Sequence, residues 1–207
     1  MIGKVSILLL TLIPLFHAAT WTIDSNFKID YQVQGSAVNF VFTLSNSKTG
    51  WMGMCFNEFM YPADCIVCQY NNNKGECFDS FNPGIKNVPY YPAPIVDTYQ
   101  SSTTPALSVT GTFGKDNLKS VVGTKVNNQI VISVTRDLDT RDKYDQLIMC
   151  GNTYKMNAAY HDSTLWNTNA GSAQTKHSQK TKTTIKFCFG ARTFLGLLGV
   201  ALMALFF

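Results

Sequence analysis

Apolar and polar residues alternate with a period of two along much of this chain, and this pattern constrains its fold most strongly. Side chains two residues apart point to the same face of a strand, so the alternation predicts strands that are buried on one face. The clearest runs are Phe27, Ile29, Tyr31 and Val33; Val38, Phe40, Phe42 and Leu44; and Ile130, Ile132 and Val134. No stretch between the two ends of the chain keeps a helical period. The pattern therefore predicts an all-β domain, either an antiparallel sandwich or a barrel.

Turn-forming residues separate the predicted strands. They occur at Gln34-Gly35, at Asn46-Ser47, over residues 71–75 and at Asn127-Asn128. Residues 82–105 differ from these short turns, because they form a long segment rich in proline and tyrosine. A loop of this length in a compact domain is commonly functional or mobile.

The N-terminal end is typical of a secretory signal peptide. Lys4 precedes an apolar run over residues 5–16, and the small residues Ala18, Ala19 and Thr20 follow it. A basic residue, a short apolar run and small residues in this order form a removable signal. The apolar run is too short to cross roughly 30 Å of membrane hydrocarbon comfortably. We therefore predict that residues 1–19 are a signal peptide and that the protein enters the secretory pathway.

The C-terminal end is also apolar, with no charged residue over residues 194–207. This tail lacks both the length of about 20 residues and the basic flank of a stop-transfer helix. A short apolar tail that follows small residues fits a GPI-attachment signal better. The small residues upstream are Ser178, Cys188, Gly190 and Ala191. We expect residues 188–207 to hold the protein at the cell surface, with GPI attachment preferred over a single membrane span.

The residues between the two ends, 20–187, are numerous enough for one domain with its own core. Lys4 and Arg192 lie in the ends, so the formal net charge falls from +4 for the chain to +2 for this domain. Only residues 176–186 are locally basic, and they are interpreted as a solvated face. The charge therefore gives no reason to expect a nucleic acid partner.

Five cysteines lie in the predicted domain, and Cys188 lies at its edge. Disulfides are the usual state of cysteines in an exported protein. Six cysteines allow 15 pairings, and the sequence alone does not settle them. The strand and turn pattern suggests Cys68 with Cys77 across the turn at residues 71–74, and Cys55 with Cys65 one hairpin earlier. This choice would leave Cys150 with Cys188. Cys150 would instead be free if Cys188 were removed with the anchor.

Cys65 and Cys68 also form a C-x-x-C motif. Covalent haem attachment needs a histidine next, and residue 69 is Gln. A redox-active pair normally opens a helix, whereas this pair lies in an apolar, strand-like run. A zinc site would need two further ligands, and the candidates are scattered through the sequence. We therefore interpret these cysteines as structural.

The usual signatures of a small enzyme are absent from the sequence. It contains no G-x-S-x-G nucleophile motif and no glycine-rich phosphate loop. Asp139, Asp142 and Asp145 form an acidic group that we interpret as a structural turn. Calcium binding through carboxylate oxygens is the alternative for these three residues.

Several segments, taken in order, resemble the DOMON domain, a β-sandwich module of extracellular haem b-binding and sugar-binding proteins. These segments are residues 50–54 (GWMGM), 60–67 (MYPADCIV), 133–145 (SVTRDLDTRDKYD) and 176–180 (KHSQK), the last of which precedes an apolar strand. The resemblance spans residues 26–187 and implies an immunoglobulin-like antiparallel β-sandwich. The chain departs from the family pattern at residues 156–160, which lack the family's Trp, and at Lys180-Thr181, where the family has Arg-Gly.

The resemblance also implies a cofactor. In cytochrome members of the family, haem b is held between a Met before the Ala-Asp pair and a His in the terminal motif. These positions correspond to Met60 and His177 as ligands of the haem iron, with His161 as the alternative histidine. A thioether and an imidazole fill both axial positions and raise the reduction potential, which suits electron transfer.

Two functions follow as expectations. The first is a membrane-tethered haem b electron-transfer module, which needs a separate redox partner protein or small reductant because the chain has no flavin or dehydrogenase domain. The alternative is a non-haem module that binds sugars or another ligand, or serves adhesion, with the aromatic loop from Tyr90 to Tyr99 as its contact surface. An enzymatic role is the least favoured, because no catalytic set is visible.

Overall fold

The computed structural model describes residues 18–45, 48–59, 62–82, 95–96, 114–166 and 177–188. Several predicted features lie outside these ranges. They are residues 1–17 of the predicted signal peptide, Met60, residues 90–94 and 97–99 of the aromatic loop, and residues 189–207 of the predicted anchor. Among the described residues, no helix is long and apolar enough to cross a membrane.

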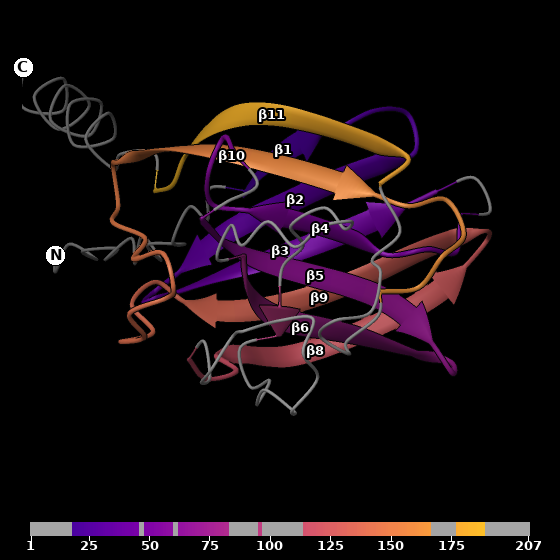
Figure 1. The fold of residues 1–207 in the computed structure, drawn as a ribbon, viewed down its shortest axis with the longest axis horizontal. Coiled ribbons are helices and arrows are strands. Elements are labelled where there is room, and N and C mark those ends of the chain that lie inside the picture. The colour runs from indigo at the N-terminus through magenta and orange to yellow at the C-terminus, as the bar shows by residue number, and fades with distance from the viewer. Residues whose placement is uncertain are drawn as a thin grey trace, which may run out of the picture.

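The described residues form two antiparallel sheets. Sheet A has five strands in the order β1 (Ala18–Thr22), β2 (Phe27–Gln34), β3 (Ala37–Leu44), β9 (Gln129–Asp137) and β8 (Leu118–Val126). Sheet B has six strands in the order β11 (Gln179–Lys186), β10 (Thr153–Tyr160), β4 (Met52–Cys55), β5 (Ala63–Asn71), β6 (Lys74–Asn82) and β7 (Ile95–Val96). The strands of both sheets cross the molecule in Figure 1. The prediction of an all-β antiparallel sandwich is therefore confirmed.

The core lies between the facing sides of the two sheets. The alternating residues of β2, β3 and β9 point into it, and Phe40, Phe42 and Ile132 have no exposed surface. Sheet B contributes alternate residues of its central strands, including Met54 and Met156. The period of two in the sequence thus corresponds to burial on one face of each strand.

Two of the predicted turns close tight hairpins. Asn72 and Asn73 join β5 to β6 with φ angles of 48° and 62°, and Asn127 and Asn128 join β8 to β9 with φ angles of 50° and 61°. Two-residue hairpin loops of type I′ have positive φ at both central positions, and Asn tolerates this conformation better than most residues do. The asparagine pairs therefore set the register of both hairpins.

The three disulfide pairs suggested by the sequence are confirmed. They join Cys55 to Cys65, Cys68 to Cys77, and Cys150 to Cys188. The first two link residues that lie directly opposite each other in the β4–β5 and β5–β6 pairs. Cys65 and Cys68 thus have different partners, as expected of structural cysteines. Cys188 is bonded just beyond the end of β11, so the last strand of sheet B is tied to the loop before β10.

Candidate functional site

Both candidate histidines lie at one end of β10 and β11. His161 directly follows β10, and His177 lies two residues before β11. The backbone N–H of Ser178 donates to the carbonyl of Tyr160 at 2.8 Å, and that of Asp162 donates to Ser178 Oγ at 3.1 Å. His161 and His177 are each half-buried there. The C-terminal end of β10 and the N-terminal end of β11 therefore bring both histidines to the same end of sheet B.

Hydrogen bonds give His161 a role in the local turn. His161 Nδ1 accepts the backbone N–H groups of Ser163 at 3.1 Å and Thr164 at 2.9 Å. A neutral imidazole that accepts at Nδ1 carries its proton on Nε2. An iron-ligating histidine instead coordinates through one nitrogen and donates an N–H from the other. As placed here, His161 is therefore a turn-stabilising residue with the wrong tautomer for coordination through Nε2.

Met60 lies outside the described residues, but the residue before it is placed. Asn157 Nδ2 on β10 donates to the carbonyl oxygens of Asn57 at 2.7 Å and Phe59 at 3.3 Å. The Phe59 ring lies under Lys182 of β11, with 4.9 Å between Nζ and the ring centroid. The loop between β4 and β5 thus leaves the sheet beside Asn157, four residues along β10 from His161.

Between these two positions, a row of small side chains crosses the outer face of sheet B. Ala159 of β10 is directly opposite Gly53 of β4, and Gly53 is directly opposite Val67 of β5. These residues point away from the main core, because their neighbours Ala158, Met54 and Ile66 point into it. We call Ala159, Gly53 and Val67 the small-residue row. A side chain at Gly53 would come within 2.9 Å of the Ile66 carbonyl oxygen, so the sheet leaves space for nothing larger there.

Two tryptophans border the small-residue row. Trp51 and Trp166 meet edge to face with 5.1 Å between ring centroids, and they pack with Val67 and Ala159 in a second hydrophobic cluster. The Trp166 backbone N–H donates to Gln69 Oε1 at 2.7 Å, which fixes this pair against β5. Both indole Nε1 atoms are buried and have no hydrogen-bond partner. Buried donors of this kind normally find an acceptor, so this face has two N–H groups that a ligand could satisfy.

A groove of about 720 Å³ opens beside the same cluster. Its walls include the aromatic residues Trp166 and Phe78 and the polar residues Gln69, Glu76 and Asn71. Gln69 Nε2 donates to Glu76 Oε2 at 3.1 Å, so these two side chains are oriented by each other. Sequence analysis missed Trp166, because this residue lies in a stretch without apolar periodicity.

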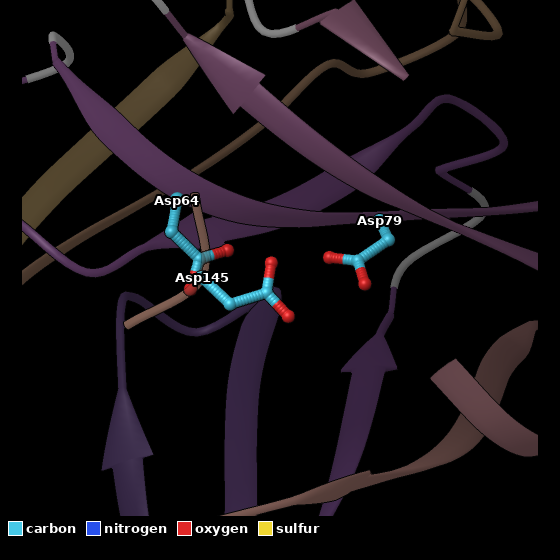
Figure 2. Close-up of side chains that lie close together, drawn as sticks. All are labelled: Asp64, Asp79 and Asp145. Atoms are coloured by element: carbon cyan, nitrogen blue, oxygen red, sulfur yellow. The ribbon is translucent and has the colours of Figure 1, made fainter. Parts of the chain in front are cut away.

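A second constellation lies between the two sheets. Asp64 of β5 and Asp79 of β6 point into the sandwich, and Asp145 approaches them from the loop between β9 and β10 (Figure 2). Arg136 of β9 faces all three from sheet A, with its Nη1 atom 2.7 Å from Asp64 Oδ2 and its Nη2 atom 3.4 Å from Asp145 Oδ2. We call these four residues the buried charge cluster. The strand positions of Asp64, Asp79 and Arg136 have the inward parity of the neighbouring apolar residues, which is the signal that sequence analysis could have used.

Burial changes the acidity of this cluster. It raises the pKa of Asp79 to about 8, and the charge of Asp145 adds to this rise. Burial also raises the pKa of Asp64 to about 6, although the adjacent Arg136 charge opposes that shift. The pKa of Asp145 is raised by burial as well. Three carboxylates are therefore held where full ionisation is unfavourable.

The turn interpretation of the acidic group holds for two of its three members. Asp139 Oδ1 accepts the Arg141 N–H at 2.9 Å, and Asp142 Oδ1 accepts the Tyr144 N–H at 3.0 Å. Both are short-range contacts of the kind that stabilise turns. Asp145 differs, because its carboxylate belongs to the buried charge cluster.

The comparisons with known proteins agree with this architecture. The structure is similar to the cytochrome b domain of pyranose dehydrogenase from Coprinopsis cinerea, with a TM-score of 0.53, 13% identity, and 82% of this chain and 80% of that chain covered. It is also similar to the cytochrome domain of Myriococcum thermophilum cellobiose dehydrogenase, with a TM-score of 0.54, 9% identity, and 86% and 87% of the two chains covered. No curated protein sequence gives a significant match. The model of the DOMON domain family matches residues 23–161, about two thirds of the sequence. This chain therefore belongs to the DOMON domain family.

Proposed function

We propose that this DOMON domain binds haem b on the outer face of sheet B and carries single electrons. The observation that carries the proposal is the position of the small-residue row. It lies between the histidine-bearing end of β10 and β11 and the point where the loop with Met60 leaves the sheet. The fold shared with two cytochrome domains is consistent with this site.

The proposed ligands are Met60 and His177. His161 is disfavoured because its Nδ1 atom accepts two backbone N–H groups. Haem b with one thioether and one imidazole ligand supplies reversible one-electron chemistry with no free iron position for a substrate. The role of the chain is then to hold two ligands and a flat apolar surface in fixed positions.

The remaining residues of the face have distinct proposed roles. Ala159, Gly53 and Val67 form a flat apolar surface because none has a side chain longer than that of valine, and Trp51 and Trp166 pack against two of them. Trp51 and Trp166 exclude water from this surface, and their unpartnered indole N–H groups can donate to carboxylate oxygens such as haem propionates. A buried donor gains most from an acceptor that reaches it without competing water.

We further propose that the domain works outside the cell, tethered at the membrane by the C-terminal segment. Three disulfides and no free cysteine among the described residues suit an oxidising compartment. A tethered carrier then exchanges electrons with a separate redox partner protein or a small reductant. Release of the protein from intact cells by a phosphatidylinositol-specific lipase tests GPI attachment, and retention after lipase treatment contradicts it.

The visible spectrum of the purified protein tests the haem proposal. We expect a Soret band with sharp α and β bands on reduction, and we expect Met60→Leu and His177→Gln each to remove this low-spin signature. His161→Gln is the matched control and should keep it. A colourless protein that takes up no added haem contradicts the proposal. Loss of the bands in His161→Gln but not in His177→Gln would reassign the histidine ligand.

A second function is favoured by the groove beside Trp166. An aromatic ring next to the oriented side chains of Gln69 and Glu76 is a common way to bind a sugar, through stacking and hydrogen bonds. Microarray binding of oligosaccharides by haem-free protein, lost in Trp166→Ala, would support this alternative. Absence of such binding, together with a haem spectrum, favours the electron-transfer function.

A further inference from the structure

Each aspartate of the buried charge cluster has one satisfied oxygen and one bare oxygen. Asp64 Oδ2 accepts the Gln146 N–H at 2.6 Å and lies beside Arg136. Asp79 Oδ2 accepts the Asn117 N–H at 2.9 Å, and Asp145 Oδ2 accepts Asn117 Nδ2–H at 3.1 Å. The Oδ1 atoms of all three residues are buried and have no hydrogen-bond partner. Donors thus orient each carboxylate from one side only.

We propose that Asp64, Asp79 and Asp145 bind a calcium ion between the two sheets. One carboxylate oxygen from each residue lies within 4.8 Å of those of the other two. Two oxygens bound to one calcium ion at 2.3–2.6 Å can be at most about 5 Å apart. Figure 2 shows the carboxylates of Asp79 and Asp145 turned toward each other, with that of Asp64 beside them. The spacing therefore already suits a shared ion.

Burial distinguishes this cluster from an ordinary acidic surface. Asp64 is 5% exposed and Asp79 is fully buried, and the Asp145 side chain is 2% exposed. An ionised carboxylate at such depth is unfavourable unless an opposite charge lies against it. The three buried Oδ1 atoms are out of reach of bulk water and accept no hydrogen bond, so a bound cation is a suitable partner for them.

The charge of the cluster indicates a divalent ion. When ionised, three carboxylates face one guanidinium, that of Arg136, so two negative charges remain. A divalent cation neutralises them.

The donor set selects the kind of ion. All candidate donors are carboxylate oxygens, which favour hard cations such as Ca²⁺ and Mg²⁺ over zinc or copper. Magnesium keeps several of its water molecules and needs near-octahedral geometry, whereas calcium accepts irregular oxygen coordination. A site closed in by Arg136, Asn117 and the two sheets therefore fits calcium better.

The proposed ion would hold together parts of the chain that the sheets leave separate. Asp64 and Asp79 belong to neighbouring strands of sheet B, whereas Asp145 belongs to the loop that follows β9 of sheet A. Calcium would thus stabilise the folded protein whether or not haem is bound. This property makes the inference independent of the proposed electron-transfer function.

The test is calcium binding by the purified mature protein after EDTA treatment and removal of EDTA. We expect one calcium per chain by titration calorimetry. We also expect the midpoint of thermal unfolding to rise by about 5–10 °C at a hundredfold excess over Kd. Asp79→Asn should lose both effects. In the absence of calcium this variant should unfold no earlier than the EDTA-treated parent, because it lacks one carboxyl group of the crowded acidic cluster. Asp145→Asn provides the same comparison at a loop position.

Asp139→Asn is the matched control, since it changes an exposed aspartate of the neighbouring turn that lies outside the cluster. It should bind calcium as the parent does. Absence of binding up to about 10 mM Ca²⁺, above the Kd of weak extracellular calcium modules, would overturn the proposal. An unchanged calcium response in both Asp79→Asn and Asp145→Asn would do the same. A thermal shift with Mg²⁺ but none with Ca²⁺ would overturn the assignment of calcium.

Discussion

Arg136 of β9 and Asp64 of β5 form an ion pair that joins the two sheets, with 2.7 Å between Nη1 and Oδ2. Both side chains are buried, at 0% and 4% exposure. Nη1 makes no well-directed hydrogen bond at this distance, so the contact is chiefly electrostatic. The guanidinium also lies 5.1 Å from the centroid of the Phe56 ring and donates from Nη2 to the Gln146 carbonyl at 3.2 Å. One arginine thus counterbalances an acidic cluster that comes mostly from the opposite sheet.

Replacement of this arginine should be severe. Arg136→Met keeps much of the side-chain volume but leaves Asp64, Asp79 and Asp145 without their only close cation among the described residues. Breaking a buried ion pair by removing one partner typically costs roughly 3–5 kcal/mol. We expect a loss of this size in the free energy of unfolding, measured by guanidinium denaturation. Lys28→Met, which breaks an exposed pair with Asp30, should change it by less than about 1 kcal/mol. Similar losses in both variants would contradict the importance of burial.

The stability of the calcium-free protein should depend on pH in an unusual direction. Asp79 has a pKa of about 8 and Asp64 of about 6 in the folded protein, compared with about 3.9 in an unfolded chain. The folded state therefore binds more protons than the unfolded state between these values. The free energy of unfolding should then fall as the pH rises from about 4 to about 8. Urea denaturation in EDTA at several pH values measures this slope.

Asp79→Asn is the informative variant for this slope, because it removes the group with the higher pKa. It should remove most of the decline between about pH 6 and pH 8 and roughly halve the decline between about pH 4 and pH 6, where Asp64 also binds more protons in the folded state. A parent protein whose stability increases steadily over this range would contradict the raised pKa values. A decline that is identical in the variant would assign it to other groups.

Much of the fold could be predicted because it depends on local patterns. Alternation fixes which side chains of β2, β3 and β9 face the core. The asparagine pairs fix two hairpins, and a hairpin in turn fixes which residues are opposite each other, as for Cys68 and Cys77. Strand parity and turn position are both properties of adjacent residues, so the sequence records them directly.

The candidate sites were harder to predict because they depend on which strands face each other. Parity places Arg136 and Asp79 on inner faces, but no local pattern indicates that β9 lies across from β5 and β6. Trp166 follows β10 in a segment with no period, and it reaches Trp51 only because the chain folds back over sheet B. The ligand assignment likewise rested on family resemblance, and the two hydrogen bonds that His161 Nδ1 accepts became visible only in the structure.

The disulfide between Cys150 and Cys188 bears on how the C-terminal segment is processed. Among the small residues that were candidates for GPI attachment, Ser178 precedes β11, whose residues pair with β10 along its whole length. Processing at Ser178 would remove that strand. We therefore expect attachment beyond Cys188, at Gly190 or Ala191. Mass spectrometry of the non-reduced mature protein should find a peptide pair linked through Cys150 and Cys188, and a free Cys150 thiol would contradict this.

Removal of that disulfide should also cost stability. It closes a longer loop than Cys55–Cys65 does, with a sequence separation of 38 against 10. In the chain-entropy model this difference corresponds to about 1 kcal/mol more stabilisation for the longer loop. The double variant Cys150→Ala with Cys188→Ala should therefore lose more stability than Cys55→Ala with Cys65→Ala. Equal losses in urea denaturation would contradict the loop-length argument.

The small-residue row offers a test of the haem site that leaves the proposed ligands intact. Ala159→Leu places a larger side chain between Gly53 and the two tryptophans. We expect a strongly reduced Soret absorbance per protein, together with a destabilisation of about 1–3 kcal/mol from overpacking.

Thr184→Leu is the matched control, because Thr184 is exposed near the far end of β11 and is directly opposite Lys155 rather than any residue of the row. Both variants should refold with the parent's far-ultraviolet circular dichroism. Full haem occupancy in Ala159→Leu would show that haem, if bound, lies elsewhere on the domain, whereas equal loss in both variants would point to a general effect of added bulk on sheet B.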